Sequence, residues 1–316
     1  MRCVVIVDKK LGIVERETPD PGPLDVVVAV RTAGINNADL MQRDGFYPAP
    51  ESWPADVPGM EMAGVVSAVG ERVHEPLLGR RVCGIVGGGA QASHCLVPSE
   101  HLLFVPDHVG WDEAGGFPEA FTTAHDALVT QGQLRAGERV LISGAAGGVG
   151  VAAVQIAHAL GAHVIAVTRT SEHFGALMAC GADETVTLDQ VSDIERVDVI
   201  LELVGAAHLA LAQYLLKPFA RIVVIGVGGS GSKVELDMLA IMATRSTLTG
   251  STLRSRSRKE KGDVADRVNH TLIPRWRTRE LSVPVAKTFS LDEVNEAYEF
   301  FGLPGKFGKV ILRVDE

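Results

Sequence analysis

The chain has 316 residues, of which 46% are hydrophobic, so it is long enough for two domains and can bury a sizeable core. Acidic residues outnumber basic ones by 39 to 30, and the net charge of -9 argues against a nucleic-acid partner, because binding to a phosphate backbone depends on Lys and Arg. The 34 glycines show no period, which excludes collagen and indicates tight turns instead.

The cysteines and the start of the chain favour a cytoplasmic protein. The apolar run at 3–7 is too short for a signal peptide, and charged residues follow it at once. Cys3, Cys83, Cys95 and Cys180 form neither a CxxC pair nor a cluster with metal-ligand spacing. We expect them to be reduced core thiols.

The first third of the chain predicts β-structure. Short apolar runs at Val26–Val30, Ala63–Val69 and Arg81–Val86 lie between Gly, Pro and charged residues.

From about residue 119 the pattern alternates between strand and helix. The strand candidates are Val140–Ser143, His163–Val167, Val197–Leu203 and Arg221–Ile225. The helix candidates are Val151–Leu160, Ser171–Cys180 and Ala207–Leu216. Such alternation predicts parallel βαβ units with helices on both faces of the sheet. After Gly250, the charged stretch 254–261 leads into a further predicted helix, and Lys309–Val314 is a candidate closing strand.

The segment Val140–Thr168 contains no Asp, Glu, Lys or Arg and is long enough to cross a bilayer. It contains five glycines, however, and its pattern changes midway. Strand, turn, helix and strand explain it better, so we expect no membrane association.

The most specific site is a glycine-rich turn, with Ala145, Gly147 and Gly150 at A-x-G-x-x-G spacing. A predicted strand precedes it, and a predicted helix and a second strand follow. In a dinucleotide-binding turn, Gly147 lets the backbone approach the pyrophosphate and Gly150 lets the helix pack close to the strand. The free N–H groups at the helix start then face the phosphates. A plain Gly-rich turn is the alternative interpretation.

The residues after the second strand indicate which cofactor is used. NAD enzymes place an Asp or Glu about twenty residues after the turn to hold the ribose hydroxyls. Here Thr168, Arg169, Thr170 and Ser171 follow that strand, and Arg169 can pair with a 2′-phosphate. We therefore expect NADPH (NADP) and not NADH. The alternative is that Arg169 and Glu172 simply face solvent.

Several motifs over essentially the whole chain carry a resemblance to a known family. They are GINNADLMQRDGFYP at 34–48, PGMEMAGVV at 58–66, PEAFTTA at 118–124, the glycine turn, and GKVIL at 308–312. In this order they resemble the medium-chain dehydrogenase/reductase superfamily, and within it the quinone oxidoreductases of the zeta-crystallin type. The segment LTGSTLRSR at 248–256 is similar to the branch that includes the p53-inducible quinone oxidoreductases.

The resemblance implies an α/β fold of two domains. A GroES-like, mostly-β catalytic domain would comprise residues 1–118 and 256–316. A Rossmann NADP-binding domain with a doubly wound parallel sheet would comprise residues 119–255. The cofactor would lie in the cleft between the domains.

The resemblance also allows a prediction about whether the chain binds a catalytic zinc. Zinc-dependent relatives carry a Cys near position 36 and a His at position 60, where this chain has Asn36 and Met60, and the four-cysteine lobe is missing. An amide and a thioether are poor ligands for a catalytic zinc, so we expect no metal.

By resemblance, the active-site residues are Asn36, Asp39 and Tyr47. The implied cofactor-binding residues are Thr123, Ala146, Gly147, Gly148, Val149, Thr168, Arg169, Ser171, Gly205, Ile225, Gly226, Gly250 and Ser251. Two departures from relatives are Met41 in place of a second tyrosine and His173 in place of a basic residue.

Each active-site residue also has a simpler interpretation. Asn36 can be a turn-stabilising amide, Tyr47 an ordinary loop tyrosine, and Asp39 a surface ion paired with Arg43 at i, i+4.

The implied reaction is hydride transfer from NADPH to a quinone or an α,β-unsaturated carbonyl, with hydrogen-bond donors in place of zinc. The alternatives are an enoyl or alkenal reductase acting on linear enones, and an NADPH-binding, crystallin-like protein with little turnover. Ser246–Ser251 has the composition of an edge strand, through which relatives commonly form a homodimer.

Overall fold

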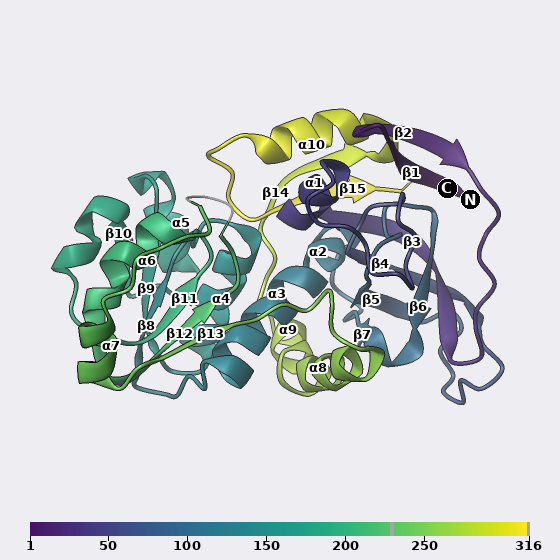
Figure 1. Ribbon diagram of the computed structural model, residues 1–316. Helices are drawn as coiled ribbons and strands as arrows, with labels where there is room; N and C mark the ends of the chain where they lie inside the picture. Colours follow the sequence, from purple (N-terminus) through teal and green to yellow (C-terminus); the bar gives the residue numbers. More distant parts are fainter. Residues whose placement is uncertain (228–230, 315–316) are drawn as a thin grey trace. The chain divides into compact units, whose positions relative to one another are not determined.

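The computed structural model describes residues 1–227 and 231–314. The chain divides into two compact units (Figure 1). Unit 1 comprises Met1–Thr122 and Leu253–Glu316, and unit 2 comprises Thr123–Thr252. Unit 2 is therefore a single continuous segment, whereas unit 1 combines the two ends of the chain.

Unit 1 is built on a mainly antiparallel sheet of seven strands. Its order is β14-β15-β3-β4-β5-β7, and β6 pairs with β3. The strands are β3 (Asp25–Ile35), β4 (Glu61–Val69), β5 (Arg81–Ile85), β6 (His94–Pro98), β7 (Leu102–Phe104), β14 (Val285–Ser290) and β15 (Lys309–Arg313). A separate hairpin pairs β1 (Arg2–Val7) with β2 (Lys10–Glu15). Because β15 pairs with β3, the last strand completes a sheet begun near residue 25.

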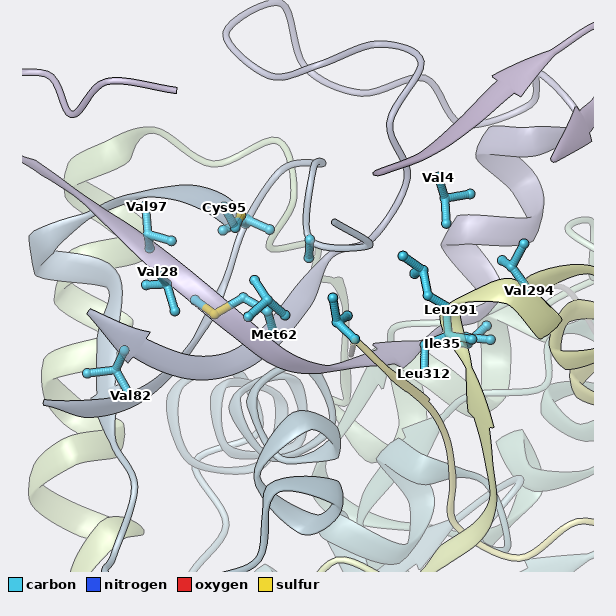
Figure 2. Packing of buried hydrophobic residues seen from close by; sticks show 14 of the residues in the cluster. Val4, Val28, Ile35, Met62, Val82, Cys95, Val97, Leu291, Val294 and Leu312 are labelled. Atoms are coloured by element: carbon cyan, nitrogen blue, oxygen red, sulfur yellow. The ribbon is translucent and has the colours of Figure 1, made fainter. Parts of the chain in front are cut away.

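Apolar residues from these strands form one large core in unit 1. Figure 2 shows Val28, Met62 and Val82, which come from β3, β4 and β5, together with Leu312 from β15. The helices of the unit are α1 (Asn37–Arg43), α2 (Trp111–Gly116), α3 (Pro118–His125), α8 (Arg258–Thr271), α9 (Ile273–Arg277) and α10 (Val294–Gly302). Helix α3 continues across the division at Thr122.

Unit 2 is a parallel sheet of six strands in the order β10-β9-β8-β11-β12-β13. The strands are β8 (Arg139–Ile142), β9 (His163–Thr168), β10 (Glu184–Thr187), β11 (Val197–Glu202), β12 (Leu216–Val224) and β13 (Thr247–Gly250). The helices are α4 (Gly148–Ala159), α5 (Phe174–Ala179), α6 (Ala206–Ala212) and α7 (Met238–Thr244), after a π-helical segment at Asp126–Gln131. The predicted fold class, a GroES-like domain with a Rossmann-type sheet, is confirmed.

Two predicted elements of unit 2 differ from the structure. The helix expected over 171–180 begins as a 3-10 turn, Ser171–His173. The helix expected over 207–216 ends at Ala212, and β12 begins at Leu216. Because Leu216 pairs with Val197 of β11 and is buried, it joins the sheet and not the helix.

The uncharged segment Val140–Thr168 divides into β8, α4 and β9, as predicted. Within the described part of the chain, no helix is both long and apolar enough to cross a membrane.

Candidate functional site

The carboxyl ends of the parallel strands in unit 2 meet at one edge of the sheet. Ile142 of β8 pairs with Leu201 of β11, Glu202 pairs with Val224 of β12, and Val224 pairs with Gly250 of β13. The chain order reverses at β8, with β9 on one side and β11 on the other. In open α/β sheets this switch point is where ligands bind.

The glycine-rich turn after β8 is shaped by two close approaches. Gly144 has a φ of +60°, which favours glycine. A Cβ on Gly150 would lie 2.4 Å from the carbonyl oxygen of Gly144, so only glycine lets α4 start this close to the strand. This contact is the packing role predicted for Gly150.

The start of α4 is an amide surface without a competing carboxylate. Gly147 is the N-cap residue and is exposed, and no acidic residue lies in the first turn of the 12-residue helix. Ala146, Gly148 and Val149 are only partly buried around it. Unpaired N–H groups and the positive end of the helix dipole favour an anion here.

Two further loops pack against each other at the same edge. Gly205 has a φ of +116°, and a Cβ there would lie 2.6 Å from the carbonyl oxygen of Gly231. A Cβ on Gly226 would lie 2.6 Å from the carbonyl oxygen of Leu203. The backbone N–H of Ile225 donates to the carbonyl oxygen of Glu202 at 2.9 Å. Bulkier residues at Gly205 or Gly226 would push these loops apart.

Glu202 lies at the end of β11 and is fully buried. Its Oε1 accepts hydrogen bonds from the hydroxyl of Ser143 at 2.8 Å and from the N–H groups of Val204 and Gly205 at 2.8 and 2.7 Å. The Ser143 hydroxyl in turn accepts from the N–H of Leu203 at 2.7 Å. One carboxylate therefore ties the start of the glycine turn to the 203–205 loop.

The second oxygen of Glu202 contacts Nδ1 of His208, which is also buried. Burial alone raises the pKa of Glu202, but the hydrogen bond from His208 and the two backbone amides outweigh it, so the pKa is lowered. Glu202 is therefore held as a carboxylate, because its donors favour the ionised form.

The end of β9 presents an arginine. Thr168 is 7% exposed, and its hydroxyl donates to the carbonyl oxygen of Thr170 at 2.8 Å. Arg169 and Ser171 are exposed, and Arg169 has no hydrogen-bond or ion-pair partner in the chain as described. The guanidinium is thus available to an anionic ligand.

The remaining predicted cofactor residues lie at both ends of unit 2. Thr123 is buried in α3. Gly250 ends β13, and the hydroxyl of Ser251 donates to Asp126 at 3.0 Å. The glycine-rich turn, the loops at Gly205 and Gly226 and the end of β13 therefore lie at one edge of the sheet. Thr123 is the exception, because it lies in helix α3 and not at a strand end.

In unit 1, Asn36 is held between a buried carboxylate and a buried ammonium. Its Nδ2 donates to Oε1 of Glu61 at 2.8 Å, and its Oδ1 accepts from Nζ of Lys309 at 2.6 Å. Nζ of Lys309 lies 2.6 Å from the same Glu61 oxygen, and the backbone N–H of Glu119 donates to the other oxygen at 2.8 Å. The side chain of Asn36 thus does more than stabilise a turn.

Asp39 does not pair with Arg43, so the surface-ion interpretation is wrong. Its side chain is fully buried and accepts from the backbone N–H groups of Asn36 at 2.8 Å and Gly59 at 3.1 Å. Arg43 instead pairs with Asp44 at 2.8 Å. Burial raises the pKa of Asp39 to about 6, against the opposing effect of the Asn36 amide. Asp39 therefore fixes the start of α1 from inside.

Tyr47 is half-buried and is supported by Arg254. The guanidinium carbon lies 5.0 Å from the tyrosine ring centroid, and Nη1 donates to the Tyr47 carbonyl oxygen at 3.0 Å. Arg254 is 4% exposed and also donates to Gln42 and to the carbonyl oxygen of Gly87. This single arginine joins the Tyr47 loop to α1 and to the loop after β5.

These residues do not fit a zinc ion. The resemblance places Asn36 and Met60 where zinc-dependent relatives would carry ligands. In the structure, the ammonium of Lys309 lies 2.6 Å from Oε1 of Glu61. A fixed positive charge beside the carboxylate opposes a second cation. Residues 1–227 and 231–314 contain no group of three or more His, Cys, Asp or Glu suited to a metal.

The sequence did not single out Glu61, Lys309, Arg254, Glu202 or His208. A usable signal existed for Glu61 and Glu202, because a carboxylate within an otherwise apolar strand needs a buried partner. Sequence spacing does not predict which residue is the partner, because Glu61 and Lys309 are far apart in the chain.

Comparisons with known proteins agree with this architecture. Residues 22–134 match the alcohol dehydrogenase GroES-like domain, and residues 148–269 match the zinc-binding dehydrogenase family. Quinone oxidoreductase-like protein 2 from Bos taurus is 30% identical over 316 residues, covering 96% of this chain and 89% of that protein. The quinone oxidoreductase from Thermus thermophilus, solved also as its NADPH complex, is 30% identical with a TM-score of 0.85, covering 99% and 100% of the two chains.

A third relative extends beyond the matched region. The synaptic vesicle membrane protein VAT-1 homolog of Rattus norvegicus is 33% identical over 258 residues, which is 77% of this chain. The match covers 64% of that relative, just under two thirds of its length.

Proposed function

This chain belongs to the medium-chain dehydrogenase/reductase superfamily and has quinone oxidoreductases among its relatives; from that premise we propose that it is an NADPH-dependent, zinc-independent reductase of quinones or α,β-unsaturated carbonyls. The observation that carries the proposal is the sheet edge of unit 2. At this edge, the first turn of α4 has no acidic residue, and two loops pack closely at Gly205 and Gly226. Arg169 lies at the same edge without an ion-pair partner in the described residues.

The cofactor, when bound, supplies the hydride from C4 of its nicotinamide. The first-turn amides of α4 would hold the pyrophosphate, and Gly205, Ile225, Gly226, Gly250 and Ser251 would hold the nicotinamide ribose and the adenine side along the strand ends. Arg169, with the hydroxyls of Thr168 and Ser171, would hold the 2′-phosphate. Thr123 would contact the same molecule.

Unit 1 would supply the substrate groups. The Tyr47 hydroxyl and the Asn36 amide are hydrogen-bond donors suited to the carbonyl oxygen that becomes negative during the reaction. Lys309 and Glu61 orient the Asn36 side chain through hydrogen bonds to its amide, and Asp39 accepts from the Asn36 backbone N–H. Asp39 is in this scheme a positioning residue, because both of its oxygens are engaged by backbone amides.

Arg169→Ala tests the choice of cofactor. Loss of one charge-assisted pair should weaken NADPH binding by about 10- to 150-fold, or ~1.5–3 kcal/mol, and leave NADH binding nearly unchanged. The salt dependence of NADPH binding should also flatten. Titrations of both cofactors at two ionic strengths measure this. An equal loss for NADPH and NADH would make Arg169 structural, and a wild-type preference for NADH would remove the NADPH assignment.

A substrate panel tests the reaction. Quinones and linear enones are assayed with NADPH and NADH, before and after EDTA. Turnover of quinones that survives EDTA supports the proposal. Exclusive turnover of linear enones would make the chain an alkenal or enoyl reductase, and binding of NADPH without turnover would make it a crystallin-like protein.

We further propose a homodimer that pairs through β13. This strand is the last in the sheet order and its outward residue Leu248 is exposed, so its edge is available for pairing. Light scattering at micromolar concentration should give twice the 33.5 kDa chain mass. A monomer mass would contradict the pairing.

A further inference from the structure

A groove of about 600 Å³ is formed entirely by residues of unit 1. None of the proposed active-site residues lines it. Trp53 and Pro54 contribute apolar surface, and Arg256, Arg258 and Lys261 contribute positive charge. The groove therefore has the mixed character of a site for a small anionic molecule.

Lys261, in the first turn of α8, carries the argument. It is 8% exposed, and across residues 1–227 and 231–314 its ammonium has no hydrogen-bond or ion-pair partner. The ring centroid of Trp53 lies 5.7 Å from Nζ. Burial lowers the pKa of Lys261, and the carboxylate of Glu119 offsets only part of this effect. A buried ammonium without a counter-ion is unfavourable, so a negative group is expected near it.

The carboxylates around the groove are already engaged. Asp25 pairs with Arg258 at 2.8 Å, and Glu100 pairs with the same arginine. Asp56 pairs with Arg16. Because these ion pairs do not include Lys261, none of them gives its ammonium a direct partner.

The cavity on the inner side of Lys261 adds no anion to the partial influence of the Glu119 carboxylate. This cavity has a volume of about 20 Å³, large enough for one water molecule. The buried Nδ1 of His101 and Oγ1 of Thr122, whose residues line the same cavity, lack hydrogen-bond partners, but neither is an anion. The groove is therefore the side from which a ligand can supply a direct ion-pair partner for the ammonium.

We propose that this groove binds a small aromatic carboxylate, with the carboxylate at Lys261 and the ring against Trp53. The carboxylate supplies the missing negative charge in a partly desolvated position, where a charge-assisted hydrogen bond is strong. The flat indole, flanked by Pro54, matches an aromatic body better than an inorganic anion. The site is independent of the proposed reductase function, because the two share no residue.

The test uses 1-naphthoate and its uncharged counterpart 1-naphthamide, titrated into the full chain by calorimetry. We expect naphthoate to bind more tightly than naphthamide. Lys261→Met keeps the apolar stem, removes the charge, and should weaken naphthoate binding by about 10- to 150-fold without changing the affinity for naphthamide. Lys259→Met is the matched control, because Lys259 is exposed on the same helix and pairs with Asp263; it should bind naphthoate like the wild type.

Three results would overturn the proposal. The first is equal affinity of the wild type for naphthoate and naphthamide, and the second is equal naphthoate affinity of wild type and Lys261→Met. The third is loss of naphthoate binding when NADP⁺, which cannot reduce a quinone, is saturating together with a quinone; this loss would place naphthoate in the reductase site. The first comparison needs no variant, so it decides even if Lys261→Met fails to fold. Quinone turnover is measured separately, and its failure would bear only on the proposed reductase function.

Discussion

Each unit buries one fully enclosed glutamate beside its candidate site, and the two are stabilised differently. Glu61 in unit 1 faces the ammonium of Lys309. Glu202 in unit 2 faces a serine hydroxyl, two backbone amides and a histidine. Glu61 also accepts from the Asn36 amide and the Glu119 N–H, but a lysine ammonium is its main charged partner, whereas Glu202 has a histidine and only neutral donors besides. We therefore expect unit 1 to be sensitive to a single substitution and unit 2 to be tolerant.

Lys309→Met should have the largest effect, because it leaves the Glu61 carboxylate buried without a cation. We expect a loss of about 3–5 kcal/mol in the free energy of unfolding, measured in urea. The double variant Lys309→Met with Glu61→Gln should recover part of it. Lys287→Met, at an exposed position on the neighbouring strand β14, is the control. A loss no greater than that of the control would contradict the view that unit 1 depends on this pair.

Asp39 extends the comparison to pH. Its pKa is raised from 3.8 to about 6, so the folded state holds the proton more tightly than the unfolded state. Stability contributed by protonated Asp39 is thus present below about pH 4 and is lost as the pH rises through 6, by ~3 kcal/mol in total. Relative to the wild type, Asp39→Asn should gain about this amount between pH 4 and 7 in urea unfolding. A difference that stays constant with pH would show that Asp39 ionises normally.

Ser143→Ala should cost less, because Glu202 keeps two amides and His208 as donors. We expect a loss of about 1–3 kcal/mol in unfolding free energy, since the N–H of Leu203 also loses its acceptor. If the proposed cofactor site is correct, NADPH and NADH affinities should fall by the same factor, because the loop position and not the phosphate contact changes. Ser192→Ala, at an exposed position, is the control. A loss as large as that of Lys309→Met would erase the difference between the units.

Tyr47→Phe should have the smallest effect. It removes one hydroxyl while the Arg254 contacts to the backbone and ring persist. The expected fall in kcat/KM is about 2- to 13-fold, or roughly 0.5–1.5 kcal/mol, with little change in NADPH affinity. An unchanged kcat/KM for both quinones and enones would remove the Tyr47 hydroxyl from the mechanism.

The sequence predicted the elements whose signals are local. The glycine turn and the apolar strands around it depend on neighbours within a few residues, and the structure contains both. The edge position of β13, by contrast, was expected from the resemblance to relatives, and β13 is the last strand in the sheet order. Buried charged residues, in strands or in helices, were harder to interpret, because their partners are distant in sequence. Asp39 shows the difficulty: its spacing to Arg43 suits a surface ion pair, yet tertiary packing places it inside, against the amide of Gly59. Spacing alone does not predict burial.

The position of β15 has a consequence for synthesis on the ribosome. All of unit 2, Thr123–Thr252, is made before the strand that completes the sheet of unit 1. Unit 2 can therefore fold while unit 1 still lacks β15, which leaves the 32–35 stretch of β3 without its partner strand. During that interval the Glu61 side chain has no lysine partner, because Lys309 follows unit 2 in the chain. The nascent chain thus passes through a stage in which its nucleotide-type domain is complete and its β-domain exposes an open strand, the kind of edge that chaperones shield and that invites aggregation.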